Sequence, residues 1–188
     1  MKTTFKLIIL LLTLSLTSCN GNLNLIDGIE GSGNVITEKR NIESPFTKIH
    51  ASTGVEVVLE QGAPSEIEVE VDDNLIKYIV TKVENGTLIV KIDGNINTME
   101  NAIIRVKTKP IDGLESSSGA SIKTINKLSG TSLTLKTSSG STIQADLEYE
   151  KVSCESTSGS EIKVSGKTLT LETKSSSGSE INAKELAS

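Results

Sequence analysis

The chain has 188 residues, a formal net charge of −5 at pH 7, no tryptophan and only two phenylalanines and two tyrosines. This length fits one domain, and the acidic balance argues against a nucleic-acid-binding surface, which needs clustered Lys and Arg. One histidine and two cysteines are too few for a structural zinc site. We therefore expect an aliphatic core, no metal and no cofactor.

The N-terminus has the features of a secretory signal. Two lysines precede the ten-residue, largely apolar run Leu7–Leu16. A membrane-spanning helix takes about twenty residues, so we interpret residues 1–18 as a cleaved signal peptide. The stretch 16–19, Leu-Thr-Ser-Cys, resembles the bacterial lipobox, whose cysteine is lipidated; the alternative is an ordinary signal peptide with an incidental cysteine. We expect Cys19 to carry a lipid anchor that attaches the protein to a membrane.

The mature chain would then comprise residues 19–188. Removing the leader and its two lysines leaves 17 basic and 24 acidic residues, a net charge of −7. We expect residues 19–30 to be a lipidated, flexible tether and residues 31–188 to be the folded domain. Cys154 would have no disulfide partner. Because Asn20 is not the aspartate that favours inner-membrane retention in some bacteria, we expect the outer membrane, on either its periplasmic or its surface face.

A short motif recurs along the chain. It consists of small hydroxyl residues, a glycine and then an aliphatic residue three positions later, and the last four glycines are 21, 19 and 19 residues apart. A more degenerate first copy surrounds Gly54. The glycines are Gly54, Gly119, Gly140, Gly159 and Gly178, and the aliphatic residues are Val57, Ile122, Ile143, Ile162 and Ile181.

This repeat predicts an all-β solenoid with about 19–21 residues per coil, because stacked coils bury apolar faces that single coils cannot. We expect the glycines to form turns with a positive φ or a sharp bend, and the aliphatic residues to form a buried ladder. The Ser and Thr columns would form hydroxyl ladders between coils. In the last copy, Leu169 and Leu171 lie further from the glycine than Leu133 and Leu135 do from theirs, which predicts a bulge or longer turn before Ser175.

The first half is less regular but also alternates apolar and polar residues, as strands do. Gly, Pro and Asn-Gly turns separate these segments, and residues 75–83 are compatible with a short helix or another strand. The expected strands are 55–60, 66–71, 87–92 and 102–107.

Several segments together resemble one known family. They are residues 31–40 (GSGNVITEKR), 46–49 (FTKI), 54–62 (GVEVVLEQG), 114–122 and the later Ser-Gly repeats. They resemble the putative auto-transporter adhesin, head GIN domain family, which is common in lipoproteins of Bacteroidota-like bacteria. The resemblance covers about residues 31–181. It implies a right-handed parallel β-helix and little about activity, and it brings no catalytic residues.

The chain offers little enzymatic chemistry. His50 is the single histidine, and strand alternation would turn it outward. Asp72-Asp73-Asn74 and the segment 93–97 offer oxygen ligands for calcium, but runs of Asp, Asn and Gly more often form turns. Glu161 and Glu180 occupy equivalent repeat positions and could act on a polysaccharide, although a solvated face also explains them. We therefore favour a non-catalytic adhesion, binding or structural protein over a polysaccharide-acting enzyme or a lectin-like glycan-binding module.

The last repeat is expected to leave an exposed strand edge. Open edges pair with other chains, so we expect self-association or docking of a partner strand there. The alternative is that Leu186 folds over the core and closes the end. A glycan or an envelope protein is the expected ligand.

Overall fold

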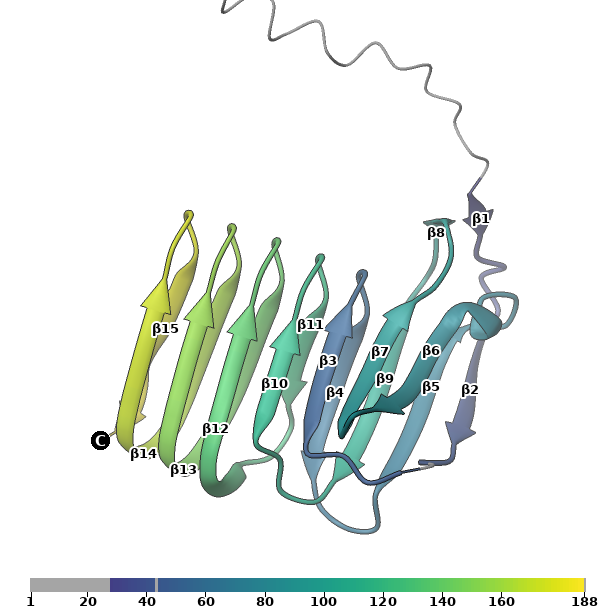
Figure 1. The fold of residues 1–188 in the computed structure, drawn as a ribbon. Helices are drawn as coiled ribbons and strands as arrows, with labels where there is room; N and C mark the ends of the chain where they lie inside the picture. Colours follow the sequence, from purple (N-terminus) through teal and green to yellow (C-terminus); the bar gives the residue numbers. More distant parts are fainter. Residues whose placement is uncertain (1–27, 43, 188) are drawn as a thin grey trace, which may run out of the picture.

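The computed structural model describes residues 28–42 and 44–187, so the expected signal peptide and Cys19 lie outside the described residues. The described residues form strands and one short 3-10 helix (Figure 1). Their bounds are β1 (Ile29–Glu30), β2 (Val35–Arg40), β3 (Lys48–Ser52), β4 (Glu56–Gln61), β5 (Glu66–Asp72), η1 (Ile76–Tyr78), β6 (Ile79–Glu84), β7 (Thr87–Ile92), β8 (Ile96–Thr98), β9 (Ala102–Thr108), β10 (Gly113–Ser116), β11 (Ser121–Thr124), β12 (Leu128–Thr137), β13 (Thr142–Ser156), β14 (Glu161–Ser175) and β15 (Glu180–Ala187).

The main sheet is mixed, and it folds back on itself around one core. One leg contains β2, β5, β9, β4 and β11; the other contains β12, β10, β3, β7 and β6; and β13 connects the two legs. β14 and β15 extend the sheet from β13, so the strands stack side by side from β15 to β6 and β2 (Figure 1). β1 and β8 form a separate small sheet, so the last two residues of the expected tether are paired.

The expectation of a right-handed parallel β-helix over residues 31–188 is wrong. β5 runs antiparallel to both β2 and β9, and β6 runs antiparallel to β7. The result is a nearly closed, barrel-like mixed sheet. One physical reason lies in the turn between β6 and β7, where Asn85 and Gly86 both have positive φ, 49° and 75°. Two such residues form the tight turn of a hairpin, which forces its strands to be antiparallel.

Strand pairing in the second half is parallel. β10 pairs with β12 at an offset of 21 residues, as in Gly113 with Thr134, and β13 pairs with β14 at an offset of 19. The bulge predicted before Ser175 is absent, because this offset continues to the pair Ser156 and Ser175. Leu171 lies opposite Val152, and Leu169 is 80% exposed at the corner where the strand bends. The register shifts instead between Lys163 and Ser165, where β14 meets β15.

Arg40 bridges the two ends of the main sheet. Its guanidinium, at the end of β2, donates to the carbonyls of Ile79 in β6 (2.6 Å) and Ile76 in η1 (3.0 Å), and to Thr81 Oγ1 (3.1 Å). Its Nε also donates to Glu38 at 2.8 Å. Residues 75–83 thus form both structures that the sequence allowed, a 3-10 turn and then a strand, and Arg40 binds both.

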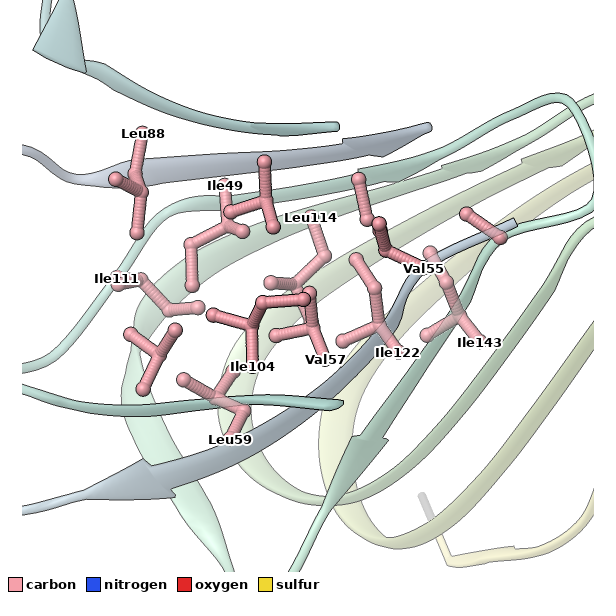
Figure 2. Packing of buried hydrophobic residues seen from close by; sticks show 14 of the residues in the cluster. Ile49, Val55, Val57, Leu59, Leu88, Ile104, Ile111, Leu114, Ile122 and Ile143 are labelled. Carbon is pink, nitrogen blue, oxygen red and sulfur yellow. The ribbon is translucent and has the colours of Figure 1, made fainter. Parts of the chain in front are cut away.

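The core lies between the two legs and is almost entirely aliphatic. Figure 2 shows Ile49, Leu88 and Leu114 of one leg near Val57, Ile104 and Ile122 of the other. These six side chains are each 0–1% exposed. The core therefore holds the rigid legs in place, and the outward residues of each strand are displayed in fixed rows.

Candidate binding surface

The repeat glycines lie in tight turns between the legs. Gly54, Gly119, Gly140, Gly159 and Gly178 have φ of 67–73°, and the residue before each also has positive φ, 52–60°. The N–H of Gly119 donates to the Ser139 carbonyl in the next turn at 3.1 Å, and Gly140 donates to Ser158 in the same way. No separate feature of the sequence predicts the positive φ of the residue before each glycine.

The aliphatic residues three positions after each glycine point into the core. Val57, Ile122, Ile143 and Ile162 are 0–1% exposed, and Ile181 in the last strand is partly buried. The hydroxyl columns lie beside them. Thr137 Oγ1 donates to Ser156 Oγ at 2.9 Å, and Ser141 Oγ donates to the Ser116 carbonyl at 2.6 Å. These buried hydroxyls link neighbouring turns and hold them in register.

The leg that contains β3, β10 and β12 displays a row of His, Glu and Lys side chains on its outer side, and the row continues into β13 and β14. Successive strands place these residues next to one another, and we call the row the charged ladder: His50, Glu115, Lys136, Glu155 and Lys174. Lys174 Nζ lies 3.0 Å from Glu155 and Lys136 Nζ lies 3.8 Å from it. The hydrogen bond from Lys174 and its charge, with a smaller contribution from Lys136, lower the pKa of the Glu155 carboxyl.

His50 is not placed for catalysis. Its Nε2 lies 3.1 Å from Ser117 Oγ. Among the described residues, no carboxylate hydrogen-bonds the other ring nitrogen, so the third group of a catalytic triad is missing. The pair lies on the open outer side of the sheet, where water competes with any substrate.

A polar hollow of ≈ 310 Å³ lies beside the charged ladder. Its polar walls are Lys48, Thr87, Glu115, Thr134 and Lys136, and Gly113 lies buried at its floor. A second hollow, ≈ 430 Å³, lies at the corner near the chain's C-terminal strands and includes Tyr149 and the exposed Leu169. A smaller hollow of ≈ 160 Å³, which includes Glu115, Lys136 and Glu155, lies further along the charged ladder.

The family model described as "Putative auto-transporter adhesin, head GIN domain" matches residues 45–188. The chain belongs to this family. The resemblance seen in the sequence is thereby confirmed. No curated protein matches the chain.

Solved structures share the fold of this head GIN domain. A "putative adhesin" from Bacteroides fragilis is 22% identical with a TM-score of 0.76, covering 85% of this chain and 76% of its own. A "Putative lipid binding protein" from Parabacteroides distasonis is 20% identical with a TM-score of 0.66, covering 85% and 78%. A "putative adhesin" from the same species is 15% identical with a TM-score of 0.59, covering 86% and 99%. None of these names is that of an enzyme.

The acidic residues considered for calcium have structural partners in this head GIN domain. Asp72 is fully buried and accepts hydrogen bonds from the N–H groups of Gly33 (2.6 Å) and Glu100 (3.0 Å). Asp73 accepts from Ser32 Oγ at 2.6 Å and from Asn34, and these bonds lower its pKa. Both carboxylates thus hold the segment before β2 in place. The sequence alone did not predict these partners, because those in that segment lie 39–41 residues away in the chain.

The remaining acidic and amide residues considered for chemistry do not form a ligand cluster. In the segment 93–97, Asp93 pairs loosely with Lys91 at 3.8 Å and Asn97 donates to the Gly28 carbonyl at 3.3 Å. Glu161 and Glu180 are neighbours across β14 and β15, and both are exposed. Within residues 28–42 and 44–187, no three His, Cys, Asp or Glu side chains are grouped to hold a metal. In the same residues, no helix is long and apolar enough to span a membrane.

Proposed function

We propose that this protein is a lipid-anchored, non-catalytic binding protein of the bacterial cell envelope. It binds its ligand through the outer side of the leg that carries the charged ladder. The supporting observation is the charged ladder itself: a row of exposed charges on a rigid sheet with a polar hollow beside it. Rows of this kind suit many weak polar contacts with a long ligand. The family name and the names of two of the three similar structures agree with an adhesin role.

We assign the anchor to Cys19 and the location to the outer membrane. The lipobox-like stretch before Cys19 supports this assignment. One acyl chain binds membranes weakly, whereas several chains hold a protein firmly. In a host that processes lipoproteins, Cys19→Ala is expected to abolish fatty-acid labelling and partitioning into detergent. Persistent labelling of this variant would contradict the assignment.

The binding role is tested with the full chain carrying Cys19→Ser, so that it is exported without lipid. Its binding to a glycan array and to isolated cell envelopes is compared with that of a variant that also carries Glu115→Gln and Lys136→Gln. The matched control carries Lys123→Gln and Glu56→Gln, which change one exposed lysine and one exposed glutamate on β11 and β4 of the other leg. We expect the ladder variant to lose binding and the control to keep it. Equal binding by both variants, or cleavage of an array glycan, would overturn the proposal.

A further inference from the structure

Gly113 occupies a strand position at which the fold does not need a glycine. It lies in β10 between Lys48 of β3 and Thr134 of β12. Its φ is outside the left-handed region, and the three atoms nearest to a Cβ built there belong to the flexible Lys48 side chain, with Cγ at 3.1 Å, so Lys48 would have to shift slightly. At Gly166, in contrast, a Cβ would collide with the backbone carbonyl of Leu147.

A glycine within a strand weakens it and often marks a place where a ligand approaches the backbone closely. At Gly113 the missing side chain interrupts an outward row that continues through Thr87 and Lys48 on one side and Thr134 on the other. The interruption opens the ≈ 310 Å³ hollow. This volume is at the small end of ligand sites, so it suits one sugar ring rather than a long apolar chain.

The charges around the hollow are available to a ligand. In the described part of the chain, neither Lys48 nor Glu115 has an ion pair, and Lys136 has only the 3.8 Å contact with Glu155, with its own side chain 53% exposed. The hollow thus offers two ammonium groups, one carboxylate and the hydroxyls of two threonines.

We propose that the hollow over Gly113 is a subsite for one carboxylated sugar unit, an inference that rests on the binding function proposed above. The ammonium groups of Lys48 and Lys136 bind the sugar carboxylate, and Glu115 accepts hydrogen bonds from ring hydroxyls. An acidic peptide is the competing ligand, and an oligoglutamate competitor in the test below distinguishes it from the sugar.

The test uses the full chain with Cys19→Ser, an oligosaccharide of uronic acid units, and the same oligosaccharide with its carboxyl groups reduced to alcohols. Binding is measured by NMR titration. We expect carboxyl reduction, Lys48→Gln and Gly113→Thr each to weaken binding by about tenfold or more. Threonine favours strands but brings its Cβ close to Lys48, so the thermal midpoint of this variant is measured beside binding to show that it folds. Lys123→Gln on the other leg is the control and should bind normally.

The outcomes separate this inference from the proposed function. If the protein binds the saccharide and Gly113→Thr binds equally well, the subsite is overturned while the binding function stands. If an oligoglutamate competes as well as the saccharide, the assignment to a sugar is overturned. If the protein ignores both oligosaccharides yet still binds envelopes through the charged ladder, only the subsite fails.

Discussion

The reactivity of the Cys154 thiol shows whether the core of the folded protein is closed to solvent. Its side chain is 1% exposed, and burial raises the pKa of its thiol to about 11. Because the thiolate is the reactive form, a protonated and buried thiol is inert. In the Cys19→Ser chain at pH 8, we expect a thiol reagent to modify Cys154 only after unfolding in denaturant. Labelling of the native protein as fast as a free thiol would show that the core opens readily.

Tyr149 makes the stability sensitive to alkaline pH. Its hydroxyl donates to the Ile111 carbonyl at 2.9 Å, and burial, followed by the charge of Asp112, raises its pKa to about 12. An unfolded tyrosine ionises near pH 10, at about its ordinary value. The folded state therefore holds this proton more tightly, and stability falls as the pH rises from about 10 towards 12.

The variant Tyr149→Phe separates the effect of the hydrogen bond to Ile111 from the effect of tyrosine ionisation. It is expected to lose about 0.5–1.5 kcal/mol at pH 7 with the hydrogen bond to Ile111, and to show a smaller further loss above pH 10. Urea unfolding at pH 7 and pH 10.5 measures both. An alkaline loss equal to that of the unmodified chain would mean that Tyr149 does not cause it.

At the scale of elements, the turns and the buried ladder can be tested separately. Gly140 and Gly159 have φ of 67°, which a β-branched residue adopts only with strain, so Gly→Val at either is expected to cost about 1–2 kcal/mol or more. Ile143→Ala and Ile162→Ala should each cost about 2–5 kcal/mol, because both side chains are fully buried.

The matched control for the two buried isoleucine variants is Ile125→Ala. Ile125 is 61% exposed, so its loss should change the free energy of unfolding by no more than about 0.5 kcal/mol. Chemical denaturation of all five variants gives the comparison. Equal costs at Ile125, Ile143 and Ile162 would contradict the burial seen here.

In the first half of the chain, the positions of the strands were predictable from the sequence, but their directions were not. Alternation of apolar and polar residues places strands at 87–92 and 102–107, where β7 and β9 lie. Alternation does not reveal the direction of the neighbouring strand, however. The Asn85-Gly86 pair is typical of a hairpin turn, which requires antiparallel strands. The repeat in the second half led instead to the expectation of parallel pairing along the whole domain.

The candidate site was much less predictable than the strands. The hollow depends on Gly113, Lys48 and Lys136 being neighbours, although Lys48 and Gly113 are far apart in the chain. Such proximity follows from long-range strand pairing, which no local pattern encodes. Strand alternation correctly predicted that the His50 side chain faces outward. Nothing in the sequence singles out Gly113, because it lies in a strand and not in a turn.

At the scale of the whole molecule, Arg40 is the residue that ties the two ends of the sheet together. Its planar guanidinium reaches the Ile76 and Ile79 carbonyls at once, which a lysine cannot do with the same geometry. We expect Arg40→Lys to lower the free energy of unfolding by about 1–3 kcal/mol. Urea denaturation measures the loss, and Lys39→Gln, at an exposed neighbour, is the control and should have little effect.

The bridge made by Arg40 also sets a limit on assembly. At that end, the Arg40 guanidinium binds the Ile76 and Ile79 carbonyls, whereas at the other end β15 has a neighbour only on the side of β14 among the described residues. Ile181 and Leu186 of β15 pack against the core, so the apolar interior there is partly covered. We expect a second copy to join the β15 edge through its own β15 edge, which gives a closed two-fold pair. Sedimentation of the Cys19→Ser chain at rising concentration should reach a dimer as its ceiling, and Asn182→Lys, which adds charge to the edge, should keep it monomeric.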